Sequence, residues 1–140
     1  MNKQKGFTII ELIVVIAIIA VLASIVLVNV TQYIGKAKDT AVKANIDTII
    51  MNATAMLADP TSSLSGFLGT YDYTAAAAQI SASNGSVDAV ATCDAMDAGD
   101  CTAAATLICV SSPLVSAGGI YCKDSSGNVG TIVCAAGVCQ

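Results

Sequence analysis

Residues 5–15 read KGFTIIELIVV, and they open the most apolar part of a chain of 140 residues. The apolar run extends from Phe7 to Val30, and Glu11 is the only charged residue within it. A helix needs about 20 consecutive apolar residues to cross a bilayer, so this run predicts a membrane-spanning helix. A carboxylate in such a helix is costly and usually has a partner or a function. The abrupt start at Phe7 and the acid at position 11 therefore both need an explanation.

Two lysines, Lys3 and Lys5, precede the apolar run. Positively charged flanks stay in the cytoplasm, so we expect a single-pass topology with a cytoplasmic N-terminus and the rest of the chain outside. The alternative is a conventional secretory signal peptide, whose shorter apolar core ends at a cleavage site of small residues. Residues 20–24 read AVLAS and resemble such a site. That alternative predicts a small, secreted, disulfide-bonded binding protein.

A second apolar pattern follows the membrane-length run. Val42, Ile46, Ile49 and Ala53 recur at three- and four-residue steps, which predicts one buried stripe on an amphipathic helix. We therefore expect a single long helix made of an apolar half, residues 7–30, and an amphipathic outer half, residues 31–58.

The chain after this helix changes in composition. Residues 59–92 are rich in Ser, Thr, Ala and Gly and predict a connecting loop, with a short helix near residues 73–80 as an option. Residues 93–140 hold short runs rich in β-branched residues, at 105–112, 119–124 and 129–135, which predict antiparallel strands.

All six cysteines follow position 92, and an even number in this part indicates disulfides in an oxidising compartment. Zinc sites favour close C-x-x-C pairs, often with His, and the spacings here lack both. If the first hairpin is centred between Val115 and Ser116, Cys109 lies opposite Cys122. The predicted pairs are then Cys109–Cys122, Cys93–Cys101 and Cys134–Cys139, among fifteen arrangements that six cysteines allow.

The composition also argues against several functional classes. The chain has no His, Trp or Arg, so the commonest general base and the bidentate phosphate ligand are both absent. After Lys43 there are eight Asp and one Lys, so no basic patch suits nucleic acid. We expect neither an enzyme nor a nucleic-acid-binding protein.

The stretch from Lys5 to Val15 closely resembles the N-terminus of type IV prepilins and of type II secretion pseudopilins. The resemblance covers the first half of the chain. It implies a pilin-like α+β fold, in which the outer half of one long helix packs on a small antiparallel sheet with a disulfide-stapled C-terminal region. Many family members have a proline where this chain has Val28, and its absence predicts a more continuous helix.

The resemblance also implies how the N-terminus is used. A prepilin peptidase removes the leader, residues 1–6, by cutting after Gly6, and the new Phe7 amine is N-methylated. Thr8 also matches the family pattern, and both Thr8 and Glu11 are expected to serve assembly, with Glu11 as the acid that assembly needs. In a bundle of parallel helices, the Glu11 carboxylate of one subunit could pair with the Phe7 amine of its neighbour and set the register between them.

We therefore hypothesise a structural subunit of a type IV pilus-like filament, stored in the bacterial inner membrane. Its expected partners are copies of itself, the prepilin peptidase, an assembly ATPase with its membrane platform, and lipid. The filament would then be an extracellular pilus. The rival within the family is the major pseudopilin of a type II secretion system, which forms a periplasmic pseudopilus.

Acidic residues suggest one further candidate site. No organic cofactor is expected, but Asp94, Asp97 and Asp100 cluster in CDAMDAGDC, and related pseudopilins can bind calcium near their C-terminal sheet. Solvated loop acids are the commoner explanation of such a cluster. Asp124, in the turn sequence DSSGN, is expected to cap backbone groups of a hairpin turn.

Overall fold

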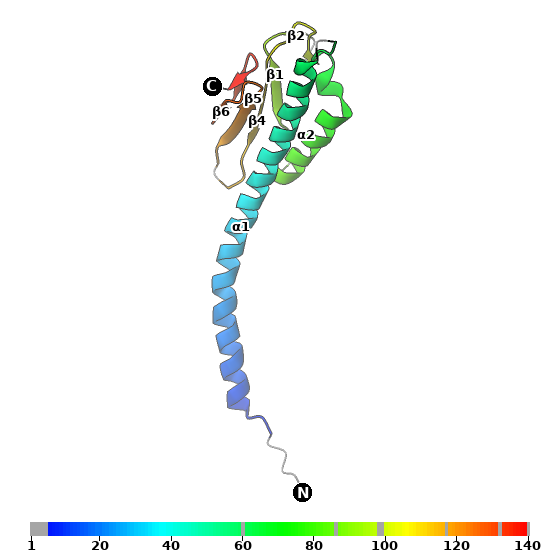
Figure 1. Ribbon diagram of the computed structural model, residues 1–140. Coiled ribbons are helices and arrows are strands. Elements are labelled where there is room, and N and C mark those ends of the chain that lie inside the picture. Colours follow the sequence, from blue (N-terminus) through cyan, green and yellow to red (C-terminus); the bar gives the residue numbers. More distant parts are fainter. Residues whose placement is uncertain are drawn as a thin grey trace. The chain divides into compact units, whose positions relative to one another are not determined.

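The computed structural model describes residues 6–59, 61–85, 87–97, 100–116, 118–131 and 133–139. The chain divides into two compact units, Met1–Ile34 and Gly35–Gln140. Helix α1 (Ile9–Ala58) contributes residues to both units, and every other element lies in the second (Figure 1). The helix continues through Val28 without a break, as the missing proline predicted.

The first unit presents apolar side chains to its surroundings. Between Phe7 and Ile34, every side chain that the structure describes is exposed. The mean hydropathy of this part of α1 reaches 3.2, and by length and composition the helix is able to cross a membrane. An uncovered surface of Ile, Val and Leu side chains needs lipid or other protein chains as its neighbours.

The second unit is built around the outer half of α1. The predicted stripe is buried, and Val42, Ile46 and Ile49 pack in one core with Ile108 and Val110 of the sheet. Figure 1 shows the sheet on one side of this half of α1 and a second helix on the other. This is the pilin-like α+β arrangement that the sequence predicted.

The segment predicted as a connecting loop contains more helix than expected. It forms the 3-10 helix η1 (Phe67–Gly69) and the helix α2 (Tyr71–Asn84). Thr70 caps α2, since its hydroxyl oxygen accepts a hydrogen bond from the backbone N–H of Tyr73. Gly85 ends the helix in the left-handed conformation, with φ of 88°. This N-cap and the run of alanines explain a longer helix than residues 73–80.

The main sheet has four antiparallel strands in the order β1 (Val90–Cys93), β4 (Ile108–Pro113), β5 (Ile120–Asp124), β6 (Val129–Gly130). Two small hairpins accompany it. One pairs β2 (Met96–Asp97) with β3 (Asp100–Cys101), and the other pairs β7 (Cys134–Ala135) with β8 (Val138–Cys139).

The disulfides correct part of the predicted pairing. Cys93 is bonded to Cys101, which is the predicted pair, but Cys109 is bonded to Cys134 and Cys122 to Cys139. The predicted pairs Cys109–Cys122 and Cys134–Cys139 are therefore wrong. The reason is strand register, because Cys109 lies opposite Asp124 and Cys122 lies opposite Ser111. The two cysteines of the β4–β5 hairpin are thus diagonal neighbours, and each bonds to the C-terminal hairpin.

Asp39 joins α1 to the tip of the β4–β5 hairpin. Its carboxylate, which is 7% exposed, accepts hydrogen bonds from the backbone N–H of Val115 at 2.6 Å and from both the N–H and the hydroxyl of Ser116. One turn earlier, a Cβ atom on Gly35 would lie 3.1 Å from Cβ of Ser116. The glycine therefore lets the hairpin tip come close enough for the acid to hold it.

The ionised form of Asp39 is favoured in the folded protein. Burial by itself raises the pKa of this carboxyl, but hydrogen bonds from Ser116 and Val115 together with the charge of Lys43 outweigh it, so the pKa is lowered. Because the pKa of Asp39 is lower in the folded protein than in the unfolded chain, the ionised carboxylate stabilises the fold at pH values above the unfolded-state pKa. This contribution is lost as the pH falls through the folded-state pKa.

We expect Asp39→Asn to lower the free energy of unfolding by about 1–3 kcal/mol near neutral pH, because buried N–H groups lose an ionised acceptor. The gap between wild type and variant should shrink below about pH 4, where the wild-type acid also protonates. Thermal unfolding of the full chain in detergent, monitored by circular dichroism at several pH values, measures the loss of stability and its pH dependence. Asp72→Asn, at an exposed site on α2, is the control. A gap that stays constant down to strongly acidic pH would contradict this role.

Candidate processing and assembly site

The predicted cleavage position precedes the first helix directly. Gly6, Phe7 and Thr8 are exposed and lie outside regular secondary structure, and α1 begins at Ile9. The Phe7 side chain is 81% exposed. Exposed, non-helical backbone is where proteases act most readily, so the Gly6–Phe7 bond lies in an accessible segment.

Thr8 and Glu11 bond to each other at the start of α1. The Thr8 backbone N–H donates to Glu11 Oε2 at 2.9 Å, and the Thr8 hydroxyl donates to the same oxygen at 2.8 Å. In return, the Glu11 N–H donates to Thr8 Oγ1 at 3.3 Å. This reciprocal arrangement is a capping box, in which the two side chains satisfy backbone donors that the first helical turn leaves unpaired.

The capping box also explains how the chain tolerates a carboxylate in its apolar segment. A carboxylate near a helix N-terminus is stabilised by the positive end of the helix dipole as well as by local N–H donors. The Glu11 carboxylate is therefore stabilised by groups of its own chain. Among the described residues, its hydrogen bonds all reach Oε2, which leaves Oε1 able to accept an incoming donor.

Reasoning from the sequence did not identify this contact. The resemblance predicts an assembly role for both Thr8 and Glu11, but it predicts no bond between them. The signal was present, because T-x-x-E directly before an apolar helical run is the sequence pattern of a capping box.

The acidic candidates further along the chain have structural partners. Asp94 accepts hydrogen bonds from the N–H of Thr106 at 2.8 Å, from its hydroxyl at 2.6 Å and from the N–H of Leu107 at 3.0 Å. Burial raises the pKa of Asp94, but these bonds outweigh it and lower the pKa. The side chains of Asp97 and Asp100 lie outside what the structure describes, so the calcium site stays a prediction.

Asp124 organises the turn between β5 and β6, as its sequence context predicted. The side chain is 1% exposed and accepts hydrogen bonds from the N–H groups of Ser126 and Asn128, from the Asn128 amide and from the N–H of Cys139. Burial acts to raise the pKa of this acid, and the hydrogen bonds lower it by more. Asp124 thereby connects the turn to the C-terminal hairpin.

Comparison with known proteins identifies the N-terminal segment. Residues 1–27 match the sequence model of the prokaryotic N-terminal methylation motif. Residues 1–27 therefore resemble the N-terminus of type IV pilins. The pilin-like segment is 52% identical over 46 residues to the type IV major alpha-pilin of Moraxella bovis and 57% identical over 42 residues to fimbrial protein Q of the same organism. It is also 47% identical over 47 residues to the major component of the type IV wide pilus of Thermus thermophilus.

The similarity to these pilins is confined to part of each chain. The three matches cover 33%, 30% and 34% of this chain and 29%, 27% and 36% of the relatives. The chain therefore aligns with about a third of the length of the curated relatives. No solved structure matches the chain significantly.

We expect Thr8→Val to weaken the first turn of the pilin-like helix by about 1 kcal/mol, because it removes the capping hydroxyl and keeps the side-chain shape. Amide exchange at Glu11 and Leu12 should rise about fivefold, measured by NMR in detergent micelles. Thr40→Val is the control, since the Thr40 hydroxyl donates to a carbonyl within the helix, that of Lys36. Unchanged exchange at Glu11 would show that the capping box does not form.

Proposed function

We propose that this chain is a structural subunit of a type IV pilus-like filament. It is held in the inner membrane by the apolar half of α1 and processed between Gly6 and Phe7, and the freed Phe7 amine is methylated. The proposal rests chiefly on one observation: the methylation motif contains a capped, acid-bearing turn that continues directly into an uncovered apolar helix.

The apolar half of α1 suits two environments in succession. Lipid solvates it in the precursor, and the same surface packs against parallel helices of other subunits in the filament. Association in hydrocarbon gains from close packing and polar contacts. A Glu11 carboxylate with one oxygen still available meets the Phe7 amine of a neighbouring subunit, and that pair sets the axial register.

The proposed transfer from membrane to filament also implies partners for this chain. A prepilin peptidase cuts the leader, and an assembly ATPase acts through a membrane platform to move subunits from bilayer to filament. The second unit, stapled by disulfides, forms the filament surface, so the chain acts structurally and not as an enzyme. The Moraxella and Thermus relatives are named as pilins or fimbrial proteins, which favours a pilus over the pseudopilus of a secretion system.

The first test is the N-terminus of the mature protein, read by mass spectrometry of the membrane fraction. We expect it to begin at Phe7 and to carry one additional methyl group. A bulky residue in place of Gly6 should leave the precursor uncut. A mature start near Ser24 or Ile25 would instead indicate a conventional signal peptide and would overturn the proposal.

The second test separates the two roles of Glu11. Glu11→Gln keeps a side chain that is able to complete a capping box but removes the negative charge, whereas Glu11→Ala removes both. We expect both variants to insert and to be cleaved, and both to form no filaments by electron microscopy, because neither pairs with an amine. Filaments of normal abundance from the Gln variant alone would show that capping, and not charge pairing, is the assembly requirement.

A further inference from the structure

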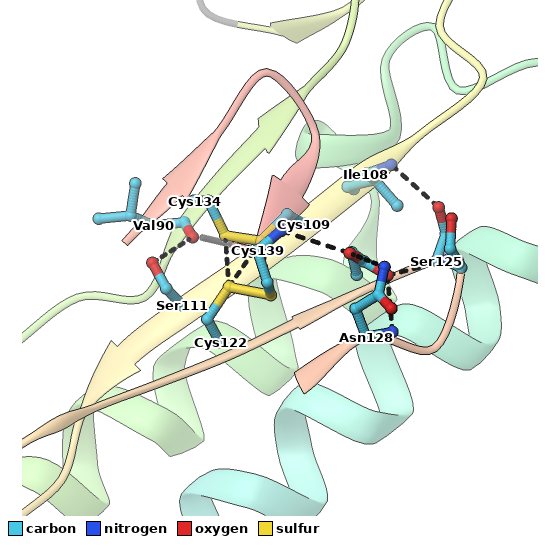
Figure 2. Close-up of a disulfide and its surroundings, with 11 residues drawn as sticks. Val90, Ile108, Cys109, Ser111, Cys122, Ser125, Asn128, Cys134 and Cys139 are labelled. Carbon is cyan, nitrogen blue, oxygen red and sulfur yellow. Dashed lines mark hydrogen bonds between the residues drawn. A yellow bond between two sulfur atoms is a disulfide. The ribbon is translucent and has the colours of Figure 1, made fainter. Parts of the chain in front are cut away.

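Four of the six cysteine sulfur atoms form one compact cluster. The Sγ atoms of Cys109, Cys122, Cys134 and Cys139 all lie within 4.8 Å of one another. Sulfur atoms that are not bonded to each other approach closely, with Cys109 at 3.0 Å from Cys122 and 3.3 Å from Cys139, and Cys122 at 3.6 Å from Cys134. Figure 2 shows the two disulfides side by side between the sheet and the C-terminal hairpin.

The backbone holds these four positions without relying on the disulfides alone. Cys109 and Cys122 lie on the hydrogen-bonded strands β4 and β5, while Cys134 and Cys139 face each other across β7 and β8. The Asp124 carboxylate accepts a hydrogen bond from the backbone N–H of Cys139, and this bond connects β8 to the end of β5. Three of the cysteines are buried, so the cluster is largely shielded from solvent.

We propose that, in the reduced protein, these four cysteines bind one Zn²⁺ ion as a tetrathiolate site. Zinc prefers four ligands in a tetrahedron with Zn–S distances of about 2.3 Å, which places the sulfur atoms about 3.8 Å apart. The sulfur atoms here already lie within 4.8 Å of one another. Binding exchanges four thiol protons for the metal and involves no electron transfer, so the chemistry is balanced by proton release alone.

A neighbouring hydroxyl supports the site. Thr92 lies directly opposite Cys109 across β1 and β4, so both side chains project from the same face of the sheet. Its buried hydroxyl has no hydrogen-bond partner among the described residues. Buried polar groups are normally paired, and a hydroxyl next to a metal thiolate donates to the sulfur. The Cys109 thiolate would give Thr92 the acceptor that it otherwise lacks.

The zinc-bound and disulfide-bonded forms exclude each other, because the same four sulfur atoms serve both. The metal would hold the β7–β8 hairpin against the sheet in chains whose cysteines are not yet oxidised. The spacing of the cysteines gave no indication of this site, since its ligands come from three separate segments brought together by the sheet.

The test uses the full-length chain in detergent, reduced with a phosphine and titrated with Co²⁺ as the spectroscopic substitute for Zn²⁺. We expect one equivalent to bind with the intense thiolate-to-cobalt absorption of a tetrahedral site, and Zn²⁺ to displace it. Zn²⁺ should also protect Cys109, Cys122, Cys134 and Cys139 from alkylation while leaving Cys93 and Cys101 reactive, as read by mass spectrometry in the unmutated protein.

Two variants that each lose two cysteines provide the matched comparison. The double variant Cys93→Ser, Cys101→Ser should keep the cobalt spectrum, whereas Cys134→Ser, Cys139→Ser should lose it. Thr92→Val should lower the affinity for the metal about tenfold. Equal binding by the two double variants, alkylation of all six cysteines in the presence of Zn²⁺, or no binding by the reduced wild type would each overturn the proposal.

Discussion

The buried stripe on the outer half of α1 is the constraint on which the second unit depends. Val42, Ile46 and Ile49 are almost fully buried against Ile108 and Val110, and each such side chain contributes roughly 1.5–3 kcal/mol when removed from water. Because one face of β4 is committed to this contact, alternate residues, including Cys109 and Ser111, must project from the other face. The sheet therefore presents Cys109 and Cys122 away from α1, where the C-terminal hairpin can reach them.

Three acids, of which Asp39 and Asp124 are buried, organise the loops of this small unit. Asp39 holds the β4–β5 tip, Asp94 holds the segment before β4, and Asp124 holds the β5–β6 turn. Each carboxylate accepts several N–H groups that a turn would otherwise leave unpaired, and each has a lowered pKa because those bonds outweigh burial. Acids that resemble metal ligands in the sequence can thus serve as fixed acceptors for backbone. Glu11 likewise accepts hydrogen bonds at the start of α1, from the N–H and the hydroxyl of Thr8.

The C-terminal hairpin has its own tight geometry. Ala136 and Gly137 both have positive φ, at 49° and 76°, as expected in a two-residue turn. A Cβ atom at position 137 would lie 2.7 Å from the backbone nitrogen of Asp94 and 2.8 Å from the carbonyl oxygen of Leu107. A glycine is required there for two reasons, conformation and space, and this close approach sets the hairpin over the sheet where two disulfides then fix it.

The sequence by itself determined the features that depend on local patterns. A continuous apolar run and the hydrophobic periodicity after it specified the long helix and its buried stripe. The T-x-x-E pattern specified the cap at the start of the helix, and the turn residues after Asp124 specified a hairpin. Only the tertiary structure decided the register of β4 against β5, and with it which cysteines meet. A shift of register by two residues keeps every side chain on the same face and leaves the hydrophobic pattern unchanged. The pairing of Cys109 with Cys134 and of Cys122 with Cys139 was therefore set by the packing of distant segments, which no local pattern records.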